Sequence, residues 1–195
     1  IAIDNADNIY VADSSRNRIY KVSQAGAVSI FAGTGEIGAR DGEGAVASFG
    51  FCSITYIDVG LPPYHLRTCA PAGLATDEAG NVYVADVHNH AIRRITPAGV
   101  VSTLAGSPAA RGSSDGTGGA AQFNYPSAVA TDRSGNIYVA DTLNHTVRRV
   151  TLAGAVTTIV GVAGSDGFTE GALPGGLIEP RGVAISGTSL FITMD

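Results

Sequence analysis

The sequence predicts an all-β fold, a β-propeller of four-stranded antiparallel blades, on three observations. A sixteen-residue stretch occurs twice in nearly the same spelling, as GNVYVADVHNHAIRRI (80–95) and GNIYVADTLNHTVRRV (135–150). No long segment shows the hydrophobic period of a helix. The aspartates that close the corresponding stretches are 73, 55 and 54 residues apart, at Asp13, Asp86, Asp141 and Asp195. An internal repeat of this length is typical of solenoids, propellers and related arrays.

One complete unit shows the predicted strands in order. They are AVATD (128–132), NIYVAD (136–141), TVRRV (146–150) and VTTIV (156–160). β-branched and aromatic residues fill these segments, and short runs rich in Gly, Asn, Asp and Ser separate them. Such short connections favour an antiparallel meander. The segments are apolar on both faces, as expected of a sheet that lies between two neighbouring sheets, and this is the arrangement of propeller blades.

The whole chain, 1–195, is interpreted as a single propeller array. It contains about three and a half blades, at approximately 1–33, 73–106, 128–161 and, with two strands, 182–195. Propellers typically have four to eight blades. We therefore expect further blades, supplied by additional sequence or by a partner chain. The first residue is not Met and the repeat is interrupted at both ends, which indicates a fragment or a processed chain.

Composition excludes several classes of protein. Hydrophobic residues make up 45% of the chain and charged residues 15%, so the chain can bury a sizeable core. The net charge is −5 and the basic residues form no dense run, which argues against a nucleic-acid partner. No apolar stretch has the roughly eighteen residues of a membrane helix, so membrane insertion is not expected.

The repeated stretches resemble the NHL repeat. The pattern D-x-x-N-H-x-[IV]-R-R occurs at 86–94 and 141–149, with GNxYVAD before it and, in the first case, GVVSTLAG after it. The resemblance covers nearly the whole chain apart from residues 50–71. The first unit departs from it, because Arg16-Asn17 stands where Asn-His is expected, and the last unit reads SLFITMD. The resemblance implies a propeller, commonly six-bladed, and leaves the function open, because one fold serves many functions.

The Asn-His pairs allow two interpretations. His90 and His145, with His88 nearby, could bind a metal, as in the amidating lyases that resemble NHL propellers. Alternatively, the aspartate and asparagine accept backbone N–H bonds and tolerate left-handed turn geometry. Equivalent positions in adjacent blades are about 10 Å or more apart, whereas zinc ligands lie about 2.0–2.3 Å from the ion. We therefore predict no metal, no cofactor and no catalytic residue, and assign a structural turn role to Asp13, Asp86, Asn89, Asp141 and Asn144.

The arginine pairs 93–94 and 148–149 should point alternately to opposite faces of a strand. One arginine of each pair is expected to reach solvent. The other is expected to lie against the neighbouring blade and to pair with a carboxylate such as Asp86 or Asp141. An RNA-binding basic face is the alternative, but the negative net charge and the lack of an aromatic-rich basic patch count against it.

Two further motifs carry weaker signals. The loops DGEG (41–44), DGTG (115–118) and DGFTEG (166–171) indicate turns, and they lack the alternating oxygen ligands of a calcium loop. Asn144-His145-Thr146 is a formal N-glycosylation acceptor. Its asparagine coincides with the turn position of the repeat, where a hydrogen bond would compete with modification.

The insertion at 50–71 is the segment that a propeller does not need. The interval from Asp13 to Asp86 is about 18 residues longer than the repeat. Both cysteines of the chain, Cys52 and Cys69, lie in the inserted residues. We predict that they form a disulfide that closes a protruding loop at its base, which would stabilise the fold by roughly 3 kcal/mol. A persistent disulfide indicates an extracellular or cell-surface protein, with reduced thiols in the cytoplasm as the alternative. Aromatic residues and Arg dominate interface energetics, so the predicted partner contacts are Tyr56, Tyr64, His65 and Arg67.

The favoured function is therefore a non-enzymatic module for protein–protein interaction or structural self-assembly. The alternative is a propeller enzyme, similar to an amidating lyase or a lactonase, with a metal at the central channel. Such an enzyme would need acidic and histidine side chains from non-equivalent repeat positions, and His65 is the one histidine outside the repeat register.

Overall fold

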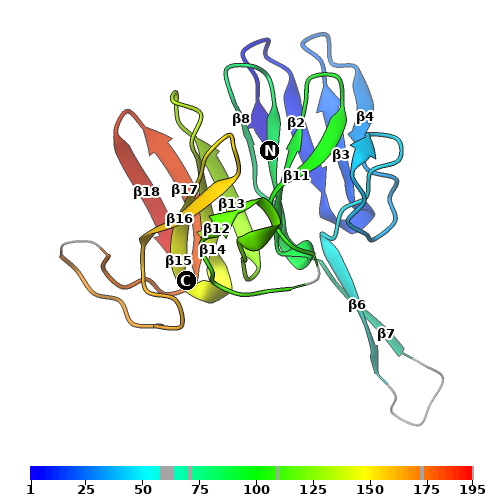
Figure 1. The fold of residues 1–195 in the computed structure, drawn as a ribbon. Helices are drawn as coiled ribbons and strands as arrows, with labels where there is room; N and C mark the ends of the chain where they lie inside the picture. The colour runs from blue at the N-terminus through cyan, green and yellow to red at the C-terminus, as the bar shows by residue number, and fades with distance from the viewer. Residues whose placement is uncertain (58–63, 70–71, 109, 172–173, 195) are drawn as a thin grey trace.

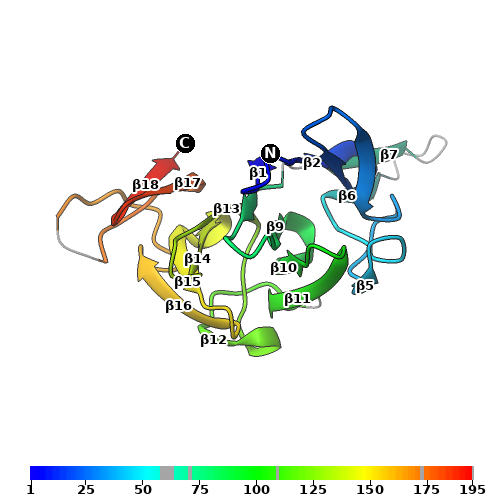
Figure 2. The same cartoon turned by 90° about the horizontal axis from the view of Figure 1, so that it is seen from above.

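The computed structural model describes residues 1–57, 64–69, 72–108, 110–171 and 174–194, and for 52–57 and 64–69 it describes the backbone. Four sheets stand side by side, and every strand pairs with its neighbour in antiparallel fashion. Seen from above, the sheets form an arc of propeller blades (Figure 2). The predicted all-β propeller fold is confirmed. The helical segments among the described residues are three-residue 3-10 turns, and none of them could span a membrane.

The first blade contains β1 (Ala2–Ile3), β2 (Ile9–Asp13), β3 (Arg18–Val22) and β4 (Val28–Ala32) in that order (Figure 1). The second contains β8 (Leu74–Thr76), β9 (Val82–Asp86), β10 (Ala91–Ile95) and β11 (Val100–Gly106). The third contains β13 (Pro126–Thr131), β14 (Ile137–Asp141), β15 (Thr146–Val150) and β16 (Ala155–Val160). The fourth consists of β17 (Pro180–Ser186) and β18 (Ser189–Met194).

The second and third blades each have a fifth strand that the sequence pattern did not predict. β5 (Gly42–Glu43) pairs with β11, and β12 (Gly116–Thr117) pairs with β16. Both strands come from the linker that precedes the blade in the chain, at the predicted DGEG and DGTG turns. Each of these linkers therefore forms the outer edge of the blade into which it leads.

The burial of equivalent strands depends on how many neighbours the blade has. All five residues of β9 are buried, because the second blade lies between the first and the third. In β2, of the first blade, Tyr10 alone is buried. Two hydrophobic clusters fill the spaces between the blades. The first includes Tyr10, Ile19, Phe49, Phe51, Val82 and Ile95, and the second includes Tyr83, Ile92, Phe123, Ile137, Val139 and Val150.

A glycine ends the last strand of the second blade because the backbone there turns close to a neighbouring strand. Gly106 has φ +92°, and a Cβ at this position would meet the carbonyl oxygen of His90, with the ring of Phe123 3.0 Å away. Any side chain would therefore be both strained and obstructed. The requirement recurs at Gly33 and Gly161, which occupy the same place in the adjacent blades.

The insertion forms a separate two-stranded sheet, β6 (Cys52–Ile57) and β7 (Tyr64–Cys69). The hairpin projects away from the blades and joins the body beside the 3-10 turn of the second blade, η2 (Val87–Asn89) (Figure 1).

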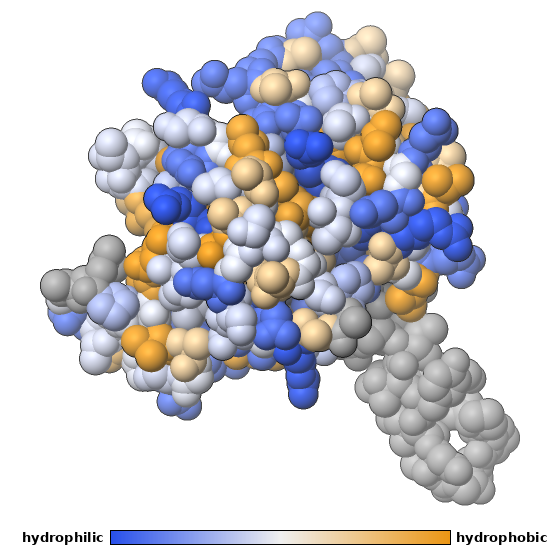
Figure 3. Space-filling view, in the orientation of Figure 1, coloured by the Kyte–Doolittle hydropathy of each residue, from blue (hydrophilic) through white to orange (hydrophobic). Residues whose placement is uncertain are grey.

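On the surface of the blades, the face turned to the viewer mixes hydrophilic and hydrophobic areas and shows no continuous apolar surface (Figure 3).

Candidate functional site

One end of the blades carries the features that the sequence marked as chemical. The linkers, the hairpin β6–β7 and three 3-10 turns lie at this end, which we call the linker face (Figure 1). The turns are η1 (Ser14–Arg16), η2, and η4 (Thr142–Asn144), and each connects the second and third strands of its blade. The fourth turn, η3 (Gly118–Ala120), belongs to the linker before the third blade.

A buried ion pair anchors the linker to the second blade. Arg93 and Asp86 are fully buried, and their Nη1 and Oδ2 atoms are 2.7 Å apart. The second guanidinium nitrogen donates to Asp41 Oδ1 at 2.7 Å and to the carbonyl of Arg40. The guanidinium also lies over the ring of Phe49, with 5.3 Å between its carbon and the ring centroid. The DGEG aspartate is thus a counterion of the repeat arginine.

The third blade repeats this arrangement. Arg148 Nη1 lies 2.9 Å from Asp141 Oδ2, and Arg148 Nη2 lies 2.7 Å from Asp115 Oδ1. The guanidinium lies 5.3 Å from the ring centroid of Phe123. Arg149, the next residue, is exposed. The expected division of each arginine pair, one buried against a carboxylate and one outward, is therefore confirmed for the third blade. The pairing of each buried arginine with a second, linker aspartate was not foreseen.

Burial and hydrogen bonds act in opposite directions on the buried carboxylates. Burial raises the pKa of Asp141 to about 6, while hydrogen bonds from the Asn124 amide, Asn144 and Arg148 lower it. Asp141 is therefore ionised at neutral pH and matches the charge of Arg148. Burial likewise raises the pKa of Asp86. Asp115 is half exposed, and despite some desolvation the hydrogen bond from Arg148 holds its pKa below the usual value.

The histidine of each Asn-His pair occupies the left-handed position of the turn. His90 has φ 51° and His145 has φ 58°. Asn17 takes this position in the first blade, with φ 49°. Each histidine ring accepts a hydrogen bond from the next linker: His90 Nδ1 from the Tyr125 amide at 3.2 Å, and His145 Nδ1 from the Glu179 amide at 3.1 Å. The two rings thus serve different joints between blades.

The predicted roles of the turn residues need correction at the asparagines. Asn89 and Asn144 are not the left-handed residues, and within the described part of the structure neither accepts a backbone N–H bond. Instead, Asn89 Nδ2 donates to the Gly38 carbonyl at 2.6 Å and to Asp86 at 2.8 Å. The aspartates do accept a backbone bond, since Asp86 Oδ1 receives the Gly50 amide at 2.7 Å. Both asparagine and aspartate therefore hold the linker.

The same contacts bear on the glycosylation acceptor and on the first unit. Asn144 is 6% exposed, and its Nδ2 donates to the Gly112 carbonyl and to Asp141, both at 2.7 Å. A glycan on this nitrogen would be incompatible with these bonds in the folded protein. In the first blade, Asp13 caps η1 and pairs with Arg16 at 2.8 Å.

A second repeated set of hydrogen bonds holds the turns at the opposite end of the blades. Asp77 Oδ2 accepts bonds from Asn81 Nδ2 at 2.8 Å and from the Tyr83 hydroxyl at 2.9 Å. The first and third blades repeat the set with Asp4, Asn8 and Tyr10, and with Asp132, Asn136 and Tyr138. The spacing D-x-x-x-N-x-Y occurs in all three units and was the signal that could have predicted it.

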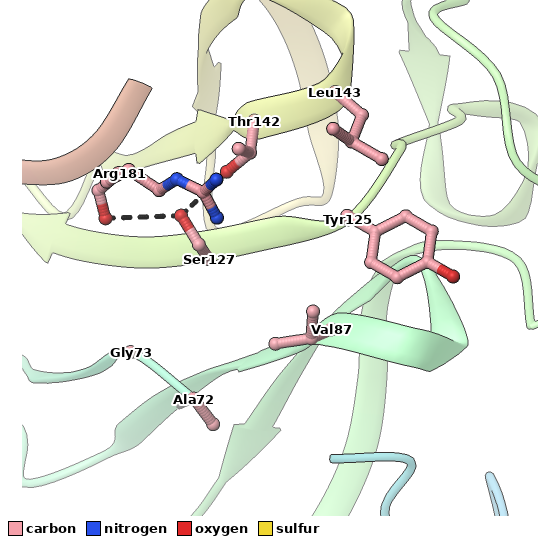
Figure 4. Close-up of a pocket in the computed structure, with 8 residues that line it drawn as sticks. All are labelled: Ala72, Gly73, Val87, Tyr125, Ser127, Thr142, Leu143 and Arg181. Carbon is pink, nitrogen blue, oxygen red and sulfur yellow. Dashed lines mark hydrogen bonds between the residues drawn. The ribbon is translucent and has the colours of Figure 1, made fainter. Parts of the chain in front are cut away.

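A cavity of about 370 Å³ opens near the inner strands. It is lined by Ala72, Gly73, Val87, Tyr125, Ser127, Thr142, Leu143 and Arg181. Figure 4 shows Arg181, Ser127 and Thr142 together at one side and Val87 and Tyr125 at the other. The hydroxyl of Thr142 donates to the Pro180 carbonyl at 2.9 Å, and its oxygen lies within hydrogen-bond distance of Ser127 Oγ at 2.7 Å. The cavity is thus largely apolar, and its hydroxyl groups are already engaged.

The hairpin places the two cysteines opposite each other. Cys52 and Cys69 are directly paired in the register of β6 and β7. The predicted contact residues Tyr56, Tyr64, His65 and Arg67 lie on these strands, with Tyr56 opposite His65, while their side chains lie outside the described part of the structure. Among the residues whose side chains are described, no three His, Cys, Asp or Glu groups gather as a metal site.

Comparison with known proteins identifies the repeat. The family model of the NHL repeat matches residues 68–95 and 123–150, which contain the two Asn-His turns. The chain contains NHL repeats at these two positions. Residues of this NHL-repeat chain are also 36% identical to the SUPPRESSOR OF QUENCHING 1 protein of Arabidopsis thaliana, described as chloroplastic, over 83 residues. That match covers 42% of the chain and 8% of the Arabidopsis protein.

Solved structures support the propeller architecture of the NHL-repeat chain. A Bacteroides thetaiotaomicron protein of unknown function matches with a TM-score of 0.74 and 20% identity, over 99% of this chain and 43% of that one. A chain of a nidogen/laminin complex matches with a TM-score of 0.60 and 18% identity, over 99% of this chain and 54% of that one. At these identities the likeness shows the fold alone. The NHL-repeat chain spans about half or less of the length of these relatives.

Proposed function

We propose that the chain is a non-enzymatic protein-interaction module whose main contact element is the hairpin β6–β7. The observation that carries this proposal is the hairpin itself, a strand pair that stands away from the blades at the one junction where the repeat is interrupted. An isolated two-stranded hairpin is marginally stable in water. A projecting hairpin on a rigid scaffold is therefore a feature that a partner, or a second copy of the chain, would stabilise by contact.

Two further points support a binding role. Ordered loops carried by a rigid scaffold are a common place for recognition, and the hairpin sequence contains Tyr56, Tyr64, His65 and Arg67, residue types that dominate interfaces. A similar propeller fold occurs in a nidogen/laminin complex, so the architecture is compatible with protein binding. The described side chains contain no cluster of three His, Cys, Asp or Glu groups that could hold a metal. The enzyme alternative would therefore need metal ligands from outside the described side chains.

Removing the hairpin tests the function. In the third blade Tyr125 is followed directly by Pro126, so deletion of residues 52–70, which joins Phe51 to Pro71, copies a junction that the chain already uses. We expect the shortened protein to keep its melting temperature within a few degrees and to lose a partner that the intact protein captures by cross-linking from its native source.

A matched control is Phe168→Ala, which alters an exposed linker residue away from the hairpin. This variant should keep the partner. If the deletion variant folds and captures the same partner with equal yield, the hairpin is not the contact element and that part of the proposal is wrong. If the intact protein captures no partner, the interaction role itself is wrong.

The disulfide is a separate prediction of the proposal. Direct cross-strand neighbours have Cβ atoms about 4.5–5.5 Å apart before any adjustment, which is close to the separation that a disulfide spans. We expect Cys52 and Cys69 to be linked, so that an unreduced, denatured sample gains no alkyl groups on treatment with iodoacetamide and a reduced sample gains two. Two alkyl groups before reduction would remove the support for an extracellular or cell-surface location.

A further inference from the structure

Two histidines sit at equivalent joints between consecutive blades. His90 links the turn of the second blade to the segment that enters the third, through the Tyr125 amide. His145 links the turn of the third blade to the segment that enters the fourth, through the Glu179 amide. In both cases the acceptor is Nδ1, which can accept a hydrogen bond only while it carries no proton. Both bonds therefore require a neutral imidazole with its proton on Nε2.

The residues that donate these bonds hold unusual backbone conformations. Tyr125 has φ 55° and Glu179 has φ 34°, both in the left-handed region that non-glycine residues seldom adopt. Such conformations persist where the surroundings enforce them. The histidine bond to the amide of the same residue is one of these constraints, so its loss would act on a segment that is already strained.

The groups around His90 disfavour a positive charge. His88, on the same turn, and His90 each meet the ring of Tyr125 edge to face, with centroids 5.1 Å and 4.9 Å apart. Burial lowers the pKa of His90, and the positive charges of His88 and of Arg111, which comes from the facing linker, lower it further. At the second joint the charged groups of the facing segment are Glu179 and Arg181, which pair with each other at 2.7 Å.

We propose that His90 is an acid-sensitive joint, at which protonation of the imidazole releases the strained entry segment of the third blade. The proton would occupy Nδ1 and turn an acceptor into a donor that faces the amide N–H. Because Tyr125 also lines the cavity near the inner strands, release at the first joint would change the wall of that cavity. The proposal is independent of the hairpin and of the protein-interaction role.

The direction of the pH effect follows from linkage. An imidazole that must be neutral in the folded joint binds fewer protons there than in the open joint, so the closed joint is favoured more as the pH rises. Its full stability is present above the ordinary histidine pKa of about 6.5 and is lost progressively below it. For the His90 joint the closed-to-open ratio should fall by up to about tenfold per pH unit between that value and the lowered pKa of His90 in the closed joint.

The first blade supplies the matched replacement. Asn17 occupies the same left-handed position without a titratable ring, so His90→Asn keeps the turn geometry and removes the titration of this ring. We would measure amide hydrogen-exchange protection of Tyr125 and Glu179 by NMR between pH 8 and pH 5, after correction for the intrinsic pH dependence of exchange.

In the wild-type protein we expect protection of the Tyr125 amide to fall by up to about tenfold per pH unit below pH 6.5. His90→Asn should remove this contribution at Tyr125 and leave the protection of the Glu179 amide as it is in the wild type at each pH. The titration of Asp86 and Asp141 is common to both proteins, so the comparison uses the difference between wild type and variant at each pH. Tyr125 protection that is constant with pH in the wild type, or an equal pH dependence in His90→Asn, would overturn the proposal, and the first of these results needs no variant to fold.

Discussion

Replacing Arg148 with alanine is expected to reduce the free energy of unfolding by about 3–5 kcal/mol. The reason is that Asp141 is fully buried and would lose the cation that faces it at 2.9 Å, so the folded protein would hold either an uncompensated buried charge or a carboxyl group that must take up a proton. The linker would also lose the Arg148 bonds to Asp115 and to the carbonyls of Ser114 and Gln122. Urea denaturation followed by circular dichroism would measure the loss as a lower midpoint.

The adjacent arginine provides the control. Arg149 is on the same strand and carries the same charge, but it is exposed, so Arg149→Ala should change the free energy of unfolding by no more than about 0.5 kcal/mol. Arg148→Lys should recover only part of the loss, because an ammonium group cannot reach both carboxylates as the planar guanidinium does. Equal effects of Arg148→Ala and Arg149→Ala would contradict the assignment of the buried pair.

Replacing Phe123 with alanine is expected to cost about 3–5 kcal/mol. Phe123 is fully buried in the cluster between the second and third blades, and its ring lies under the guanidinium of Arg148 at 5.3 Å. The smaller side chain would leave a cavity and remove the ring that Arg148 covers. The measurement is the shift in melting temperature together with the urea midpoint.

Phe168→Ala removes the same number of atoms from a linker position that is 52% exposed. It should shift the free energy of unfolding by no more than about 0.5 kcal/mol. Because Phe123 and Arg148 are in contact, the double variant should lose less than the sum of the two single losses. Strict additivity would argue against the stacked arrangement.

The sequence predicted the blades well because each strand carries its own local signal. Apolar β-branched segments, short polar turns and a fixed repeat length determine the meander without reference to distant residues. The alternation of Arg148 and Arg149 similarly predicted that one arginine of the pair is buried and the other faces outward. These features depend on residues that are close in the chain, and their recurrence at a fixed interval indicated an array of blades.

The linker contacts could not be predicted in the same way. The sequence predicted Asp41 and Asp115 to be turn residues, because it does not show that each linker forms the outer edge strand of the next blade. The partner of Asp41 is Arg93, 52 positions further along the chain. The left-handed histidines were missed for a different reason: asparagine is the usual choice at such a position, and it stands directly before the histidine here.

The way in which each linker is divided between neighbours decides where this chain can be cut. β5 and Asp41 belong to the second blade, and β12 and Asp115 belong to the third, although all four precede their blades in the chain. A recombinant repeat that starts directly after Ala32 would carry its own counterions and edge strand. A recombinant repeat that starts at Gly73 would lack Asp41 and would leave Arg93 without this counterion. Shuffling or duplication of units should therefore tolerate breakpoints immediately after the fourth strand and fail at breakpoints before the first.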